Sequence, residues 1–172
     1  MRFLTRYGLA AVVLTAATAL GVMNGLNVVG VIAVGALADR CGGKDLLALV
    51  YAARAGAYAM FLLAPGAWGV WGFAAIAGFS YWATAPLTTS LTADMYGLKS
   101  LGTLSGLSFL AHQVGGAISI QFAGAMRDLT GSYAIPFAIA GLLLLPAALS
   151  AFSIRERTYS ARYQALPRST GV

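Results

Sequence analysis

Two pairs of polar side chains stand in long apolar stretches of this chain, where they could bind a solute or hold helices together. Asn24 and Asn27 are three residues apart, so on a helix they share one face. His112 and Gln113 form a second group, and His112 is the one histidine, a residue type that could carry a coupled proton. Uncharged polar groups in apolar surroundings either bridge helices or line an aqueous path. All four residues are therefore candidate pore-lining groups.

Arg54 is the one charged residue between Asp45 and Asp94. An arginine in the middle of an apolar membrane helix costs about 2.5–3.5 kcal/mol on insertion scales, so its side chain should face protein or water. Two interpretations stay open. Arg54 is either a structural arginine, bonded to carbonyls or to a neighbouring helix, or a functional residue that binds an anion or takes part in gating.

The residue types and motifs of this sequence do not indicate an enzyme. Ser80, in Gly78-Phe-Ser80-Tyr, and His112 are a weak match to an intramembrane serine protease, because no oxyanion donors accompany them. The single cysteine, Cys41, excludes an internal disulfide and a cysteine metal cluster. No phosphate-binding glycine loop follows a strand pattern. We therefore expect no catalytic residues, no metal and no cofactor.

The surroundings of these residues are those of a membrane protein. The chain is 59% hydrophobic and 9% charged, against about 25% charged in soluble domains. A hydrocarbon core about 30 Å thick needs roughly 20 apolar residues per helix. Several longer runs contain no charged side chain, namely residues 7–38, 55–93, 100–126 and 129–154. The lipid bilayer is thus the expected partner. The net charge of +6 does not indicate nucleic-acid binding, because the basic residues sit at the ends of apolar segments.

The pattern predicts an all-α membrane protein with five transmembrane helices. Their expected ranges are 9–38, 46–64, 67–92, 100–126 and 133–154. A charged, glycine-containing turn over 39–45 should end the first helix, and Pro65-Gly66 should divide the second from the third. Pro86 predicts a kink in the third helix. The remaining residues, 155–172, form a polar cytoplasmic tail.

The distribution of Lys and Arg predicts the orientation, because cytoplasmic loops are enriched in these residues. With the amino terminus outside, the inner side holds the larger group: Arg40, Lys44, Lys99, Arg155, Arg157, Arg162 and Arg168. The outer side then holds Arg2, Arg6 and Arg127. We therefore expect the amino terminus outside and the carboxyl terminus in the cytoplasm of a bacterial inner (plasma) membrane. An amino terminus outside the membrane, with no segment before it, suggests that helices upstream of this chain are missing.

Small residues at four-residue spacing predict close helix packing. Gly21 and Gly25 lie on one face of the first helix, and Gly102 and Gly106 on one face of the fourth. Close backbone approach drives helix association in lipid, where no hydrophobic force acts between helices. We expect the first and fourth helices to pack tightly through these glycines.

The motif Gly35-Ala-Leu-Ala-Asp39-Arg40-Cys-Gly-Gly-Lys44 resembles the G-x-L-x-D-R-x-G-x-[KR] signature of the major facilitator superfamily. Further motifs at family-like spacing follow it. They are Ala93-Asp-Met-Tyr-Gly97, Gly102-Thr-Leu-Ser-Gly106, Gly115-Gly116 and Gly124-Ala-Met-Arg-Asp-Leu-Thr-Gly-Ser-Tyr133. The series looks most like the monocarboxylate or oxalate–formate branch, over about residues 7–154.

The resemblance implies that the five helices correspond to helices eight to twelve of the fold, the carboxyl-terminal half without its first helix. It implies a missing amino-terminal half or a second helical bundle as partner, and transport of a small solute, an organic anion, by alternating access. Asp39 and Arg40 would form the inner gate. Asn27 and Val31 stand where monocarboxylate carriers often have a charged pair. A non-transporting membrane scaffold, or a remnant fragment without independent activity, is the alternative.

Overall fold

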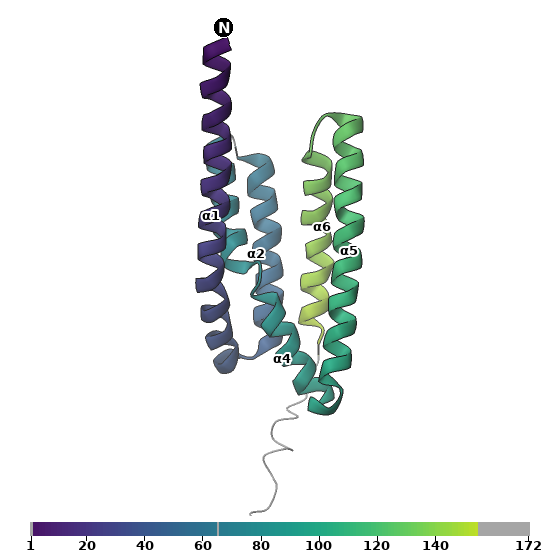
Figure 1. The fold of residues 1–172 in the computed structure, drawn as a ribbon. Helices are drawn as coiled ribbons and strands as arrows, with labels where there is room; N and C mark the ends of the chain where they lie inside the picture. The colour runs from purple at the N-terminus through teal and green to yellow at the C-terminus, as the bar shows by residue number, and fades with distance from the viewer. Residues whose placement is uncertain (1, 65, 155–172) are drawn as a thin grey trace, which may run out of the picture.

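The computed structural model describes residues 2–64 and 66–154, and the regular structure in these ranges is entirely helical. The long helices run up and down beside one another (Figure 1). In chain order they are α1 (Arg2–Cys41), α2 (Gly43–Leu63), α3 (Ala67–Ser80), α4 (Thr84–Tyr96), the 3-10 turn η1 (Leu98–Ser100), α5 (Leu101–Thr130) and α6 (Ala134–Phe152). The all-α prediction is confirmed, and the predicted tail over 155–172 lies outside the described residues.

Two of the expected boundaries are wrong. The turn expected over 39–45 is a single residue, Gly42, because α1 continues to Cys41 and α2 begins at Gly43. Gly42 has φ 88, a backbone conformation that favours glycine. The helix expected over 67–92 is two helices, α3 and α4, with a break at residues 81–83. The kink predicted from Pro86 is therefore a full interruption just before the proline.

Helix α2 is the centre of the bundle, since it packs against α1, α3, α4 and α6. At the end near Gly42, apolar side chains from α1, α2, α4, α6 and the 81–83 break form a leucine-rich core. Its buried members are Val34, Leu46, Leu47, Ala48, Val50, Ala83, Leu87, Leu91 and Ala151. Toward the other end an aromatic cluster joins α2, α3 and α6, with Phe61 4.9 Å from Phe137 and Tyr58 5.3 Å from Phe73 between ring centroids.

The crossing of α1 and α3 depends on two glycines. A Cβ atom at Gly78 would lie 2.7 Å from the carbonyl oxygen of Met23, and one at Gly30 would collide with the carbonyl group of Phe79. By contrast, a Cβ at Gly21, Gly25, Gly102 or Gly106 would meet nothing within 4 Å. The expectation that those four glycines mark tight packing is wrong within the described chain, where α5 contacts α4, η1 and α6 but not through Gly102 or Gly106.

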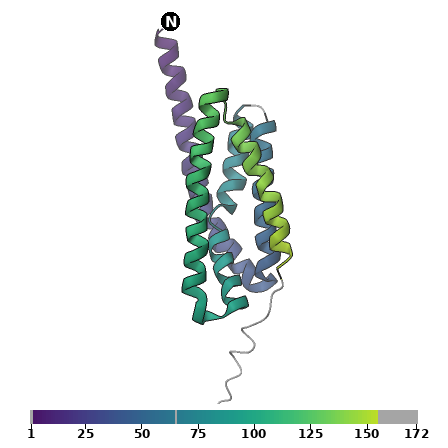
Figure 2. The ribbon, with the colours of Figure 1, turned by 90° about the vertical axis from the view of Figure 1, so that its right-hand side faces the viewer.

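Three described helices are long and apolar enough to cross a membrane: the Ala10–Arg40 part of α1, α2 and α6. Helices α3 and α4, of 14 and 13 residues, are each too short because of the break. Helix α5 has 30 residues but none is buried, and serine, histidine and glutamine side chains interrupt its apolar sequence. It stands on the outside of the bundle (Figure 2). The five membrane crossings therefore stay a prediction.

The α1–α3 crossing predicts a sharp difference between two glycine substitutions. Gly78→Ala should lower the free energy of unfolding by about 1–3 kcal/mol, because its Cβ would press on the Met23 backbone. Gly25→Ala is the matched control and should be neutral or slightly stabilising, since its Cβ would meet open space. Thermal unfolding in detergent, followed by circular dichroism, measures both. Equal midpoints for the two variants would contradict the close contact.

Candidate functional site

The interruption between α3 and α4 frees backbone groups that need partners. Proline has no N–H, so Pro86 cannot bond the carbonyl of Trp82 as a helical residue would. Instead the N–H of Ala85 donates to the Trp82 carbonyl at 3.1 Å, and the chain turns over residues 81–83. In hydrocarbon an unpaired peptide group costs several kcal/mol. The carbonyls of Ser80 and Tyr81 and the N–H of Trp82 therefore have to be satisfied by other parts of the protein.

Arg54 of α2 supplies the donors for the two carbonyls. Its Nη2 donates to the oxygen of Ser80 at 2.5 Å and to the oxygen of Tyr81 at 2.7 Å. The guanidinium also lies 5.2 Å from the ring centroid of Tyr81 and 6.0 Å from that of Tyr51, within the range of cation–π attraction. Of the two interpretations open from the sequence, this geometry corresponds to the structural arginine bonded to carbonyls of a neighbouring helix.

Asn27 of α1 supplies the acceptor on the other side of the break. Its Oδ1 accepts the Trp82 N–H at 3.2 Å, and the Asn27 side chain is buried, with 7% of its surface exposed. Helices α1 and α2 thus hold the break from two sides, one by accepting and one by donating. Together these three hydrogen bonds fix where residues 80–82 lie relative to α1 and α2.

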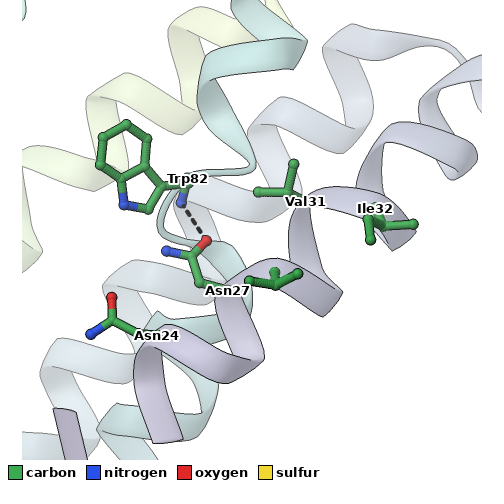
Figure 3. A pocket seen from close by; sticks show the side chains of 6 residues that line it. Asn24, Asn27, Val31, Ile32 and Trp82 are labelled. Atoms are coloured by element: carbon green, nitrogen blue, oxygen red, sulfur yellow. Dashed lines mark hydrogen bonds between the residues drawn. The ribbon is translucent and has the colours of Figure 1, made fainter. Parts of the chain in front are cut away.

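Beside this contact an open groove of about 510 Å³ runs along α1 (Figure 3). The residues that line it are Asn24, Asn27, Val28, Val31, Ile32 and Trp82. Asn24 is exposed, and its Nδ2 donates to the Leu20 carbonyl one turn earlier at 2.8 Å. The structure therefore brings two of the four pore-lining candidates, Asn24 and Asn27, into one concave surface.

The other two pore-lining candidates lie elsewhere. His112 and Gln113 are exposed on α5, and neither is among the groove residues. Within the described part of the chain no hydrogen bond or ring contact involves them, and they face outward from this bundle. The structure divides the candidates into a pair beside the α3–α4 break and a pair on the outermost helix.

The gating candidates Asp39 and Arg40 lie in the last turn of α1, and both are exposed. Neither forms an ion pair with another residue of the described ranges. The negative end of the helix dipole favours Arg40 there and disfavours Asp39.

Sequence reasoning missed Trp82. Its indole lines the groove and its backbone carries two of the hydrogen bonds at the break. The signal was its position four residues before Pro86, which is where a proline always leaves one helical carbonyl without its usual donor.

The chain matches the family model of the Major Facilitator Superfamily over residues 1–120, and it therefore belongs to that superfamily. It is accordingly a protein of a membrane-transporter family and not of an enzyme family. No solved structure matches it.

Two curated relatives come from Bacillus subtilis (strain 168). The uncharacterized MFS-type transporter YcxA is 35% identical over 68 residues, which cover 40% of this chain and 17% of YcxA. The uncharacterized transporter YybO is 38% identical over 71 residues, which cover 41% of this chain and 16% of YybO. The matched part of the chain thus spans about a sixth of the length of each relative.

The contacts of Arg54 predict that its removal lowers stability. Arg54→Leu should cost about 3–6 kcal/mol, because two charge-assisted hydrogen bonds to the carbonyls of Ser80 and Tyr81 disappear. The amount of folded protein in the membrane, measured by fluorescence-detected size exclusion in mild detergent, should fall.

Arg127→Leu is the matched control for this loss of charge. Arg127 also lies over a tyrosine, Tyr133, at 5.5 Å, but it is exposed and donates to no carbonyl of the described residues. Its replacement should leave the yield within a factor of two. A well-folded Arg54→Leu protein with altered solute preference would instead favour the functional interpretation of Arg54.

Proposed function

We propose that this chain is the carboxyl-terminal part of a major facilitator transporter, in which its helices serve as helices eight to twelve. On this assignment α3, the break and α4 make one crossing. From Ala67 to Tyr96 they contain enough residues for about 45 Å at helical rise, which exceeds the hydrocarbon thickness. The order of motifs from Gly35 to Tyr133 supports the same assignment.

The observation that carries this proposal is the solvent exposure of the residues of α5. All its residues are exposed or only half-buried, although it contains polar side chains such as His112, Gln113 and Gln121. Lipid is a poor environment for such a face, whereas a second helical bundle or an aqueous path between two bundles suits it. The amino-terminal half of a transporter would supply that bundle.

The transported solute on this proposal is a small organic acid, moved by alternating access between the two halves. The branch resemblance to monocarboxylate and oxalate–formate carriers supports this choice. The amino terminus lies outside and the carboxyl terminus in the cytoplasm of the plasma (bacterial inner) membrane, which places Asp39 and Arg40 at the inner gate. Their exposure at the end of α1 leaves them accessible to the other half.

A non-transporting scaffold is the second candidate, and one observation favours it. Arg54 and Asn27 are both engaged in holding the α3–α4 break, as a purely structural role requires. The two candidates differ in uptake. Proteoliposomes that contain the complete reading frame around this chain should accumulate labelled monocarboxylates above empty liposomes. No uptake of any small organic acid or amide by that complete protein would favour the scaffold.

The gate assignment predicts that Asp39→Asn slows transport without loss of protein. In the complete protein, initial uptake should fall by about ten- to a hundredfold, because one charged gate contact of about 1.5–3 kcal/mol is lost in one of the two access states. Asp45→Asn is the matched control: Asp45 is also exposed and lies in the first turn of α2. It should transport normally. Normal uptake kinetics in Asp39→Asn would remove Asp39 from the gate.

A further inference from the structure

The two asparagines of the groove have their side-chain amides oriented by hydrogen bonds to the backbone. The N–H of Trp82 is a donor, so Asn27 must present its Oδ1 to it. The carbonyl of Leu20 is an acceptor, so Asn24 must present its Nδ2 to it. In each amide one end is therefore engaged, and the opposite end is left for another partner.

The two side-chain amide atoms without a partner in the described chain are one hydrogen-bond acceptor and one donor. Asn24 keeps its Oδ1, an acceptor, and Asn27 keeps its Nδ2, a donor, and neither atom has a partner among the described residues. The two side chains are three residues apart on one face of α1, and Figure 3 shows both beside the indole of Trp82. The groove thus offers one acceptor, one donor and an aromatic face.

The groove offers no charge. Its lining consists of two amides, three aliphatic side chains and one indole. The cation Arg54 is committed to the carbonyls of Ser80 and Tyr81, which precede Trp82, and is not part of the lining. An ionised carboxylate has acceptor oxygens alone, so one of them would face the Asn24 Oδ1 without a counter-charge, in surroundings where unpaired charge is costly.

We propose that this groove binds an uncharged planar group with an adjacent donor and acceptor, of the carboxamide type. The N–H of the ligand group donates to Asn24 Oδ1, its carbonyl oxygen accepts from Asn27 Nδ2, and the rest of the molecule lies against Trp82. An un-ionised carboxylic acid has the same donor and acceptor and is the second source of this chemistry. The inference rests on the proposed transport function and specifies that the solute enters the groove in its neutral form.

The test uses the chain in lipid nanodiscs with Trp68 and Trp71 replaced by Phe, so that Trp82 is the one tryptophan left. Trp82 fluorescence is titrated at pH 7.5 with benzamide and with benzoate, which have the same size and shape. Benzamide should bind at least tenfold more tightly than benzoate. At pH 4, where a carboxylic acid is about half protonated, benzoate should gain affinity while benzamide does not change.

Two variants and one control make the test specific. Asn24→Leu removes the acceptor, and Asn27→Asp removes the donor but keeps an oxygen for the Trp82 N–H, so the break stays closed. Each should weaken benzamide binding about tenfold, the effect of one lost hydrogen bond. A chain whose one tryptophan is Trp68, which is exposed on α3, reports non-specific partitioning into lipid.

Three outcomes would overturn the inference. They are benzoate binding as tightly as benzamide at pH 7.5, benzamide binding unchanged in Asn24→Leu, or no benzamide signal above the Trp68 control. Each leaves the transport proposal standing, because uptake by the complete protein is measured separately. Conversely, a complete protein without uptake whose groove still prefers benzamide would refute transport and keep the binding site.

Discussion

The structure depends on one requirement: peptide groups that leave a helix inside hydrocarbon must find partners in the protein. Pro86 interrupts the hydrogen-bond ladder between α3 and α4, and residues 80–82 then need an acceptor and donors from outside. Asn27 and Arg54 provide them from two different helices. Because a guanidinium carries five N–H donors in a planar fork, a single Arg54 nitrogen can serve two consecutive carbonyls.

The same hydrogen bonds that stabilise the α3–α4 break also determine the shape of the groove beside it. Asn27 accepts from the Trp82 backbone and thereby has its free nitrogen fixed, while Trp82 is held where its indole borders α1. The groove is therefore formed by the contacts that close the helix break, and not by side chains added to a finished scaffold. A change in the groove that removes the Asn27 oxygen would also release the backbone of Trp82. For this reason, variants that keep the oxygen separate the two roles.

Part of this architecture could be predicted from residue types, and the successes share a physical reason. The charge-free runs predict helices in lipid because charge is costly there, and the position of Arg54 predicts a satisfied arginine for the same reason. Pro86 predicts an irregularity, since it lacks a donor. The assignment of Asn27 and Arg54 to this break could not be predicted, because which side chains reach a broken helix depends on how α1 and α2 cross it. The close contacts of Gly30 with Phe79 and of Gly78 with Met23 were missed. The spacing of small residues shows which helix faces lack side chains, but not which neighbouring helix they meet.

The glycines distinguish the inside of this bundle from the surface that it offers to others. Gly30, Gly69 and Gly78 have backbone atoms where a Cβ would stand, so their size is required by contacts within the chain. Gly102, Gly106, Gly115, Gly116 and Gly124 all lie on α5 and would meet nothing. A helix with this many unoccupied small positions, together with exposed polar side chains, gains little from lipid and much from a close-packed partner. Within the described chain, the small-residue face of α5 therefore packs against none of the other helices.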